Sequence, residues 1–496
     1  MNKELQNFKG KLLSGDLGVN KALFKKIFEK DAVFRIREVI SENSTPFECC
    51  VMFMDGMINT AIVNESIIRP LIITNVTNTQ NTLIDFLKRQ VLFANEIKES
   101  SDIAELISGL LYGDTVLLAS NSRTGLIINT KGWRTRGISE PNDERVLQGP
   151  REGFDEALML NLAMLRRKLP TPDLCVEFLK CGRKTDTKIF ICYLDSLVNH
   201  KTVETVKKRI SKIDIDGILD SNYINELTTK NRFSLFKTVG STERPDVVAA
   251  RLLEGRLAVM VDGTPVVLTI PYLFVENFQS DEDYYLNFWF ASLGRVIRYI
   301  CYYLSICLPG LYVAVSVYNP QLLPASFLVS LATARGGIPF SSFAECFALI
   351  LIFEILKETG VRMQQSLGHA LSIVGGLVVG QAAVEAKLVS APLLIIVALS
   401  GISGLMIPRL KTSVFYVKIA LLLFSASLGL FGFFIGLTLT QIHLYSLNSF
   451  GCDYVETTKQ LSENSLKDTI IRVPWTSMIT RPLSLTKNIV RQKKRK

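Results

Sequence analysis

Long stretches without a charged side chain are confined to one part of this chain. They lie at 299–334, 363–384, 388–408 and 419–442, whereas charged and apolar segments alternate through residues 1–290. An α-helix rises about 1.5 Å per residue, so roughly 20 apolar residues span the hydrocarbon core of a bilayer. The pattern predicts an integral membrane protein in which a soluble part precedes a polytopic membrane part.

Composition divides the chain into four regions. We expect two cytoplasmic α/β subdomains at 1–170 and 171–290, an all-α transmembrane domain at 291–445 and a basic cytoplasmic tail at 446–496. The first boundary rests on Pro170-Thr-Pro172, which stops a helix. No apolar stretch follows the start of the chain, so no signal peptide is expected and the soluble part is predicted to stay in the cytoplasm.

Alternating short elements are predicted for the soluble part. A helix is expected at 152–169, with Asp155 and Glu156 in its first turn and basic residues in its last. Asp262-Gly263 is a strong hairpin signal between two strands. The other expected elements are strands at 49–54, 115–119, 125–129, 174–181, 187–194, 257–261 and 265–270, and helices at 200–212 and 244–254.

Charge and motifs exclude several classes of function. The net charge is +10, but six of the basic residues lie within 487–496, which favours a tail facing anionic lipid over a nucleic-acid surface. The nine cysteines form no C-x-x-C pair and the three histidines are far apart, so no metal site is expected. Phosphate-binding and hydrolase motifs are absent, so we expect neither a cofactor nor an enzyme.

The first part of the membrane region contains proline and acidic residues. We predict a spanning helix at about 296–318, a broken segment at about 322–334, and an apolar helix to Glu358 that contains Glu345 and Glu354. A carboxylate at membrane depth must be paired, protonated or in contact with water. Either 322–358 is a re-entrant or interfacial pair, or the two carboxylates snorkel to the membrane surface or form salt bridges with Arg335 or Lys357.

Basic residues predict the orientation. Arg295 and Arg298 precede the first span and the basic tail ends the chain, so both termini are expected in the cytoplasm. That requires an even number of crossings, four with a re-entrant pair and six otherwise. Arg409 and Lys411 then fall on the outer side, against the usual distribution of positive charge.

A helix at about 367–386 has two distinct faces at 100° per residue. One face combines apolar and polar residues, and in an oligomer it could line an axial pore whose valines form a dry constriction. The alternative is an ordinary helix with Gln381 bonded within one protomer. The candidate pore-lining residues are Val374, Leu377, Val378, Gln381 and Glu385, and the candidate helix-packing residues are Gly376, Gly380 and Ala383.

Several motifs, taken in order over about 40–490, resemble the A subunits of the GerA family of spore germination receptors. In the soluble part they are Gln148-Gly-Pro-Arg-Glu-Gly-Phe154, Leu165-Arg-Arg167, Glu254-Gly-Arg256 and Val261-Asp-Gly-Thr-Pro265. In the membrane part they are Ala334-Arg-Gly-Gly-Ile-Pro-Phe340, Ile373-Val-Gly375 and Gly380-Gln-Ala-Ala-Val-Glu-Ala386.

The resemblance implies a multi-pass subunit of the spore inner membrane. It implies a transporter-like B subunit and a lipoprotein C subunit as partners, and assembly as a homo-oligomer, expected to be a pentamer. The resemblance also implies that the oligomer is a ligand-gated channel releasing monovalent cations to trigger germination. Pro339, Phe340 and Glu345 would belong to a gating loop. The family often has Pro-Phe-Pro where this chain has Pro339-Phe340-Ser341.

Other functions remain open from the sequence. A SpoVAF-like accessory channel shares these motifs with the receptor subunits, and adjacent B and C genes would favour the receptor. A secondary transporter is suggested by the broken helices, although no inverted internal repeat is visible. A structural or docking protein is the third class, and reconstituted conductance would exclude it.

Overall fold

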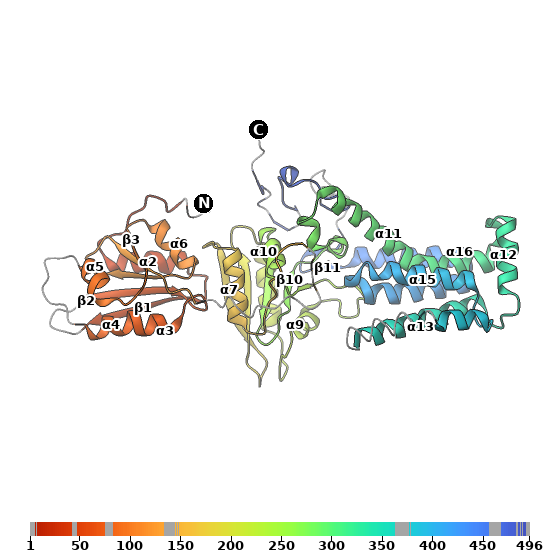
Figure 1. Cartoon of the computed structure of the whole chain (residues 1–496), viewed down its shortest axis with the longest axis horizontal. Coiled ribbons are helices and arrows are strands. Elements are labelled where there is room, and N and C mark those ends of the chain that lie inside the picture. The colour runs from red at the N-terminus through yellow and green to blue at the C-terminus, as the bar shows by residue number, and fades with distance from the viewer. Residues whose placement is uncertain are drawn as a thin grey trace.

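Three bodies lie in a row in the computed structural model, in which two α/β units are followed by a bundle of long helices (Figure 1). The first α/β unit is at one end, the second in the middle and the helices at the other end. The structure describes residues 5, 7–41, 47–74, 83–132, 144, 146, 148–362, 376, 378–455, 468–482, 485–486, 488 and 490–492.

The first unit is a five-stranded antiparallel sheet with a helical layer on each face. Along β2, alternate residues enter opposite layers: Cys49 and Val51 pack with the helices around Ile67, whereas Cys50 and Met52 pack with α2 and α6. Burial on both faces explains why β2 is almost wholly apolar. The strands are β1 (Phe34–Ser41), β2 (Phe47–Met54), β3 (Ile97–Ser100), β4 (Thr115–Ala119) and β5 (Gly125–Ile128), in the order β1-β2-β4-β5-β3. The helices are α2 (Leu17–Ile27), α3 (Thr60–Ile62), η1 (Val63–Ile68), α4 (Arg69–Ile73), α5 (Leu83–Phe86), η2 (Leu87–Val91) and α6 (Ile103–Leu111).

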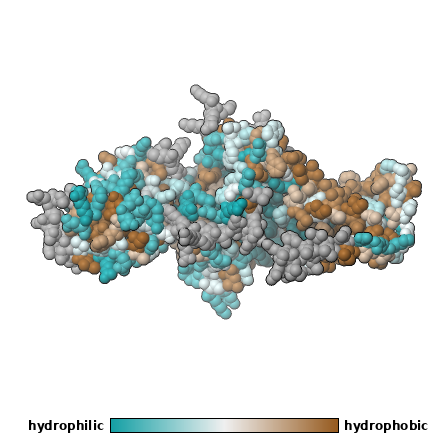
Figure 2. Space-filling model, viewed as in Figure 1, coloured by the Kyte–Doolittle hydropathy of each residue, from teal (hydrophilic) through white to brown (hydrophobic). Residues whose placement is uncertain are grey.

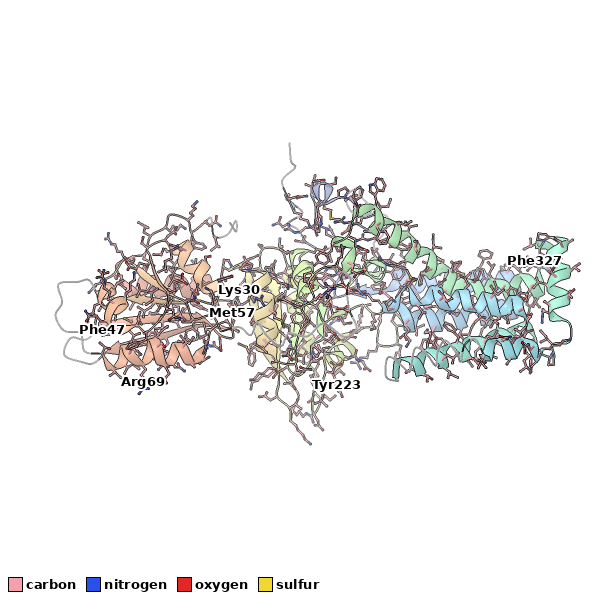
Figure 3. The ribbon with its side chains drawn as sticks, in the orientation of Figure 1. Lys30, Phe47, Met57, Arg69, Tyr223 and Phe327 are labelled. Carbon is pink, nitrogen blue, oxygen red and sulfur yellow. The ribbon has the colours of Figure 1, made fainter. Side chains whose placement is uncertain are left out.

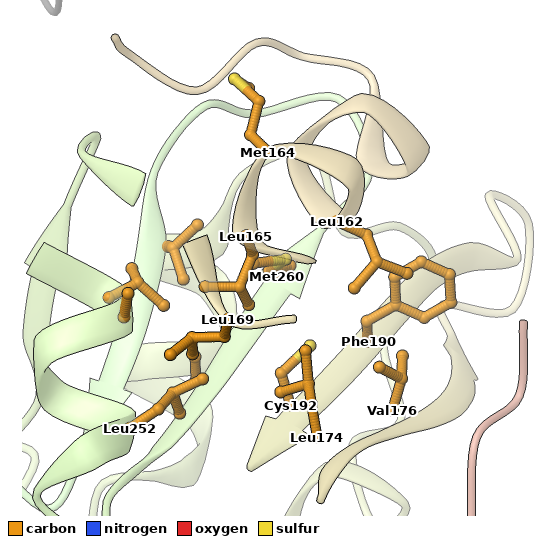
Figure 4. Close-up of a cluster of buried hydrophobic side chains, with 14 of the residues drawn as sticks. Leu162, Met164, Leu165, Leu169, Leu174, Val176, Phe190, Cys192, Leu252 and Met260 are labelled. Carbon is orange, nitrogen blue, oxygen red and sulfur yellow. The ribbon is translucent and has the colours of Figure 1, made fainter. Parts of the chain in front are cut away.

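The second unit has the same plan. Leu162 and Leu165 of α7 and Leu252 of α10 cover one face, against Val176 and Phe190 of the sheet (Figure 4), and α8 and α9 cover the other. The strands are β6 (Leu174–Cys181), β7 (Thr187–Leu194), β8 (Gly240–Thr242), β9 (Leu257–Val261) and β10 (Val267–Ile270), in the order β6-β7-β9-β10-β8. The helices are α7 (Leu158–Lys168), α8 (His200–Ile210), α9 (Ser221–Thr228) and α10 (Pro245–Leu253).

The two units are structural repeats. Their sheets have the same strand order, the paired strands β1 and β2 match β6 and β7 in length, and the nine-residue α6 matches α10. The sequences of the two units are similar at two corresponding positions. Asp55-Gly-Met-Ile-Asn59 corresponds to Asp195-Ser-Leu-Val-Asn199, and Leu110-Leu-Tyr-Gly113 corresponds to Leu252-Leu-Glu-Gly255.

Most predicted elements of the soluble part are confirmed. The strands at 115–119, 174–181, 187–194 and 257–261 are β4, β6, β7 and β9 with unchanged bounds. The Asp262-Gly263 turn joins the antiparallel strands β9 and β10, and Gly263 has φ +89°. That left-handed conformation favours glycine, which accounts for the signal.

The helix predicted at 152–169 was wrong at its start. α7 begins at Leu158, so Asp155 and Glu156 precede it. Tertiary contacts hold this stretch extended: the Phe154 amide donates to the Glu243 carbonyl at 2.7 Å, and the Asn161 side chain bonds both backbone groups of Asp155. α7 packs in the core of the second unit, although it precedes the predicted boundary at 170. The four-region division stays a prediction.

Hydrophobic residues gather on the surface of the helical body (Figure 2). Among the described residues, the stretches Phe288–Tyr318 and Pro408–Ser446 are long and apolar enough to cross a membrane. The helices are α11 (Phe288–Val313), η5 (Ala314–Tyr318), η6 (Pro320–Leu322), α12 (Ala325–Arg335), α13 (Ser342–Arg362), α15 (Ala391–Leu405), η7 (Pro408–Leu410) and α16 (Lys411–Ser446). Beyond them lie β11 (Asn448–Ser449), β12 (Cys452–Asp453) and η8 (Trp475–Ser477), and η3 (Phe274–Phe278) and η4 (Asp281–Tyr284) precede α11.

The single span predicted at 419–442 was wrong, because α16 folds back on itself. Gly429 has φ 60° and ψ −140°, which interrupts the helix. A Cβ built on Gly436 would lie 3.0 Å from Leu421, a contact that a straight helix of that length cannot make. Ser413 and His443, near opposite ends of α16, both bond the 234–235 loop. The two halves are therefore antiparallel, each about 26 Å long, and both ends lie beside the second unit.

Arg409 and Lys411 lie at the end of the helical bundle beside the second unit, whereas the predicted topology placed them on the side away from the soluble part; their side of the membrane stays a prediction. Arg409 donates to the carbonyls of Glu276 and Gln279, both at 3.1 Å, next to the second unit. Lys411 pairs with Glu358 near the end of α13. The 21-residue α13 therefore runs from α12, at the far end of the bundle, back toward the soluble units (Figure 1).

Candidate functional site

The helical residues 378–385 carry most of the candidate pore face. Val378 is 57% exposed, and Gln381 and Glu385 are exposed beside it. The Gln381 amide donates to Glu385 at 3.0 Å, one helical turn apart. Val374 and Leu377, which were assigned to the same face, lie outside the described residues. The result is a polar stripe on the outside of a largely apolar bundle.

The opposite face of these residues packs inward. Gly380 is buried, and a Cβ there would lie 3.5 Å from Leu394 of α15. Ala383 packs against the buried cluster around Leu393 and Val397. Gly376 differs, because no atom of the described residues lies within 4 Å of the position that its Cβ would take. Two of the three predicted packing residues thus contact the same protomer.

The candidate gating loop joins α12 to α13. Pro339 and Phe340 are exposed, whereas Glu345 is only 2% exposed. One Glu345 oxygen accepts from Arg335 at 3.4 Å and the other from the backbone amide of Ser390 at 3.0 Å. Ser390 begins α15, whose amino-terminal dipole favours a carboxylate. Glu345 therefore ties α12, α13 and α15 together.

Both acidic residues of the 322–358 region have basic partners. Glu345 pairs with Arg335, and Glu354 pairs with Lys357 at 2.9 Å one turn along α13. Of the two alternatives open from the sequence, ion pairing is therefore realised for both carboxylates. Pairing removes most of the cost of placing these groups in an apolar bundle.

Residues 274–287, here called the pre-membrane segment, connect the second unit to α11. Asp283 accepts from Arg295 at 2.9 Å and from Arg298 at 2.8 and 2.9 Å. Burial favours the neutral acid, but the hydrogen bonds and charges of Arg298 and Arg295 lower the pKa of Asp283 overall. The segment is thus tied to the first turns of α11 by a buried ionic cluster.

A second buried cluster ties the pre-membrane segment to the second unit. Arg251 and Arg256 both pair with Glu276, which is 2% exposed. Arg256 also donates to the Pro271 carbonyl at 3.1 Å. Arg409, at the start of η7, pairs with Asp281 at 2.9 Å. The two clusters, centred on Glu276 and Asp283, form what we call the ionic junction.

Sequence reasoning missed the ionic junction. Its charges are scattered over α10, the turn after it, the pre-membrane segment, α11 and η7, so no local pattern marks them. Glu254-Gly-Arg256 was noted only as part of a family motif. The repeated Leu-Leu-x-Gly turn could have singled it out, because the first unit carries Tyr112 and Asp114 at the corresponding positions. Among the described residues, no three His, Cys, Asp or Glu side chains are placed to hold a metal ion.

Comparison with known proteins identifies the family of the chain. The family model for the Bacillus/Clostridium GerA spore germination protein matches residues 22–484. The chain belongs to this GerA family. It is 38% identical to spore germination protein KA of Bacillus subtilis (strain 168) over 96% of this chain and 88% of that protein. It is 37% identical to the uncharacterized membrane protein YfkQ of the same strain, over 87% of this chain and 84% of YfkQ.

One solved structure is also similar to the GerA chain. The N-terminal domain of the A subunit of the Bacillus megaterium spore germinant receptor GerK3 is 29% identical, with a TM-score of 0.39. The match covers 53% of this chain and 98% of that domain.

Proposed function

We propose that this GerA-family chain is the A subunit of a nutrient germinant receptor, and that it assembles as a homo-oligomer around a path for monovalent cations. Family membership assigns it to spore germination. The observation that carries the channel is the exposed stripe of Val378, Gln381 and Glu385 on the outside of the bundle. A paired amide and carboxylate cannot face lipid, so they must face water or another protein.

In the proposed oligomer these stripes surround one axis. Gly380 and Ala383 hold the helix against α15 of the same protomer, which leaves the opposite stripe for the axis. A ring of Val378 side chains would form a dewetted constriction, and Gln381 with Glu385 would give cations a polar path. Glu345, which joins the 336–341 loop to the start of α15, would transmit movement of that loop to the neighbouring helix.

We further propose six crossings with both termini in the cytoplasm of the spore, and the spore inner membrane as the location. The crossings would be α11, α13, the segment that returns to Ser390, α15 and the two halves of α16. Ser390 lies at the Glu345 end of the bundle and Glu358 at the opposite end, which supports the returning segment. A transporter-like B subunit and a lipoprotein C subunit are the proposed partners, and a pentamer is the proposed assembly.

Thiol modification of the reconstituted oligomer tests the pore face. Gln381→Cys should make the cation current sensitive to a charged, water-soluble thiol reagent, because the side chain would lie in the aqueous path. Ile395→Cys is the matched control, since Ile395 is 66% exposed on α15 but lies on an apolar helix. Its current should be as insensitive as that of the unmodified protein.

The gate has a separate test. Val378→Ala should widen the constriction and give a cation leak without nutrient, whereas Gly380→Leu should disturb packing and lower the amount of assembled protein. If Gln381→Cys conducts but is insensitive to the reagent and Val378→Ala does not leak, the stripe does not line the path.

A further inference from the structure

A cavity of about 370 Å3 lies where the second unit, the pre-membrane segment and the end of the chain meet. α10 forms one wall, Tyr284 and Tyr285 form another, and the chain beyond α16 closes it with Trp475 and Arg481. Its volume falls within the range of roughly 300–1,000 Å3 that is usual for small-ligand pockets. The site is distinct from the pore stripe, which lies on the outside of the helical bundle.

The charged groups of this cavity are not all matched. Each wall carboxylate has a guanidinium partner: Asp246 pairs with Arg244 at 2.7 Å, Asp281 with Arg409 at 2.9 Å, and Glu254 with Arg491 at 3.0 Å. Arg481 differs from these arginines. It donates to the carbonyls of Leu253, Asn488 and Val490, and no carboxylate of the described residues lies within ion-pair distance of it.

Arg481 is therefore a partly buried cation that pairs with no carboxylate among the described residues. Burial and repulsion from the nearby Arg491 lower the pKa of Arg481, and attraction from Glu254 offsets them only in part. Both effects would be relieved by an anion in the cavity, and the planar guanidinium fork matches a phosphate or carboxylate group. The aromatic side chains beside it provide an apolar surface for the rest of a ligand.

The position of the cavity relative to α11 indicates which kind of anion can reach it. The chain around Trp475 lies across the start of α11: the Trp475 indole donates to the Tyr284 carbonyl at 3.3 Å, and Ser292 donates to the Arg472 carbonyl at 3.0 Å. A few residues along, Trp289 and Phe290 of α11 are 72% and 66% exposed. Exposed aromatic residues at the start of a membrane helix are typical of the headgroup level of a bilayer.

We propose that this cavity binds a phosphate-bearing ligand, in the first place the headgroup of an anionic phospholipid, with Arg481 contacting the phosphate and Tyr285 and Trp475 contacting the remainder. The site goes beyond the proposed channel and does not depend on it. Because α10, the pre-membrane segment and the end of the chain all contribute walls, a bound headgroup would hold the second unit against the membrane surface.

A second cavity, between the corresponding turn of the first unit and α7 of the second, provides an internal control. Its volume is about 540 Å3, and it is lined by Tyr112, Glu152, Arg167 and Lys168. There each cation contacts a carboxylate, because Glu152 is shared between Lys168 at 3.0 Å and Arg167 at 3.5 Å. This cavity should show no preference for anionic lipid.

Native mass spectrometry of the full chain in detergent tests the proposal, with phosphatidylglycerol, phosphatidylcholine or inorganic phosphate added. The unmodified protein should retain phosphatidylglycerol about tenfold more strongly than phosphatidylcholine, as expected for one charge-assisted contact. Arg481→Gln should abolish that preference, and Lys168→Gln should leave it unchanged. An unchanged preference in Arg481→Gln would overturn the site.

Two further measurements are needed. One distinguishes a lipid headgroup from free phosphate as the ligand, and the other distinguishes loss of binding from damage to the fold. If inorganic phosphate displaces the lipid and stabilises the protein in an Arg481-dependent way, the anion site stands and the lipid source is rejected. Because Arg481 also holds the chain end in place, Ala250→Trp is the second variant: Ala250 lines the cavity and is exposed, so the indole fills the space and leaves the Arg481 contacts intact. Loss of lipid selectivity in Ala250→Trp, with the chain end still protected from protease, supports the site; retained selectivity overturns it.

Discussion

The two α/β units share a backbone plan but differ in the side chains on one turn. After α6 the Gly113 amide donates to the Leu110 carbonyl and the Asp114 amide to the Gly109 carbonyl. After α10 the amides of Gly255 and Arg256 donate to the carbonyls at the corresponding positions. Gly113 has φ +89° and Gly255 has φ +93°, a conformation that favours glycine at the end of a helix. The turn itself is thus unchanged between the units.

The residues around that glycine decide what each unit binds. In the first unit Asp114 pairs with Lys131 of the same unit at 2.8 Å. In the second unit Glu254 and Arg256 reach Arg491 and the buried Glu276, which belong to the chain end and the pre-membrane segment. The same turn geometry thus carries charges that, in the second unit alone, contact the pre-membrane segment and the chain end.

The two units also contact each other, in part through a short parallel bridge between Asp31 and Val176. The buried pair of Asp31 and Arg166 and the exposed pair of Lys30 and Asp195 join them. Lys30 and Met57 lie on the side of the first unit that faces the second (Figure 3), and Met57 follows Gly56, which lies against Met159 of α7. We therefore expect the first unit to depend less on the helices than the second does.

The largest effect is expected at the ionic junction. Arg256→Met keeps the length of the side chain but leaves the buried Glu276 with Arg251 as its remaining cation, and removing one partner of a buried pair costs about 3–5 kcal/mol. The thermal unfolding midpoint of the full chain should fall by several degrees. The matched change Asp114→Asn should barely move it. Equal shifts in the two variants would break the comparison between the units.

A smaller effect is expected between the units. Asp31→Asn leaves Arg166, which is 1% exposed on its side chain, without its carboxylate, at a cost of about 3 kcal/mol. The first unit should then unfold in a separate, earlier transition, while the transition of the second unit and helices is unchanged. Calorimetry of the full chain measures both. A uniform downward shift of a single transition would mean that the units fold as one body.

The N-caps of α3 and α8 compare the local stability of the two units. Asn59 accepts from the Ala61 amide at 3.0 Å, and the corresponding Asn199 accepts from the Lys201 amide at 3.2 Å. Asn59→Ala and Asn199→Ala should each cost about 1 kcal/mol in urea unfolding, because each removes one cap. Glu204→Ala, on the exposed face of α8, is the control and should cost less. Clearly unequal costs would show that the repeat preserves shape without preserving local energetics.

The smallest effect concerns pH. Burial raises the pKa of Asp114 despite Lys131, so its contribution to stability is present at low pH and is lost as pH rises through that pKa. Glu254 behaves in the opposite way: burial would raise its pKa, but Arg256, Arg251 and Arg491 lower it overall, so its contribution is present at neutral pH and lost as pH falls through that pKa. Urea unfolding between about pH 3 and pH 6, the range around ordinary carboxyl pKa values, should show this. The unmodified protein should lose stability with rising pH through Asp114 and gain it through Glu254. Asp114→Asn should therefore remove the first change and Glu254→Gln the second. If both variants altered the pH dependence of stability in the same direction, the opposite roles of the two carboxylates would be refuted.

Local chemistry made much of the fold predictable. The β9 run is apolar throughout and ends at Asp262-Gly263, so its length and its hairpin follow from the sequence. The faces of 378–385 also follow, since a 100° period places Gly380 inward and Val378 outward. The pore role of that outward face stays a prediction.

The structural repeat was only partly predictable from the sequence. Its traces, Asp55 to Asn59 and Asp195 to Asn199, are in the sequence. They are short, and only the shared strand order reveals that they occupy corresponding places.

By itself the sequence determined where the apolar helices lie, which strands are buried on both faces, and where glycine ends a helix or makes a turn. Each depends on neighbours within a few residues. Only the tertiary structure decided that α16 folds back at Gly429, that α7 starts at Leu158, and that Glu276 meets Arg256. These outcomes depend on contacts between distant segments: an uncharged run looks the same whether it crosses once or doubles back, and a charge shows its partner only after the chain has folded.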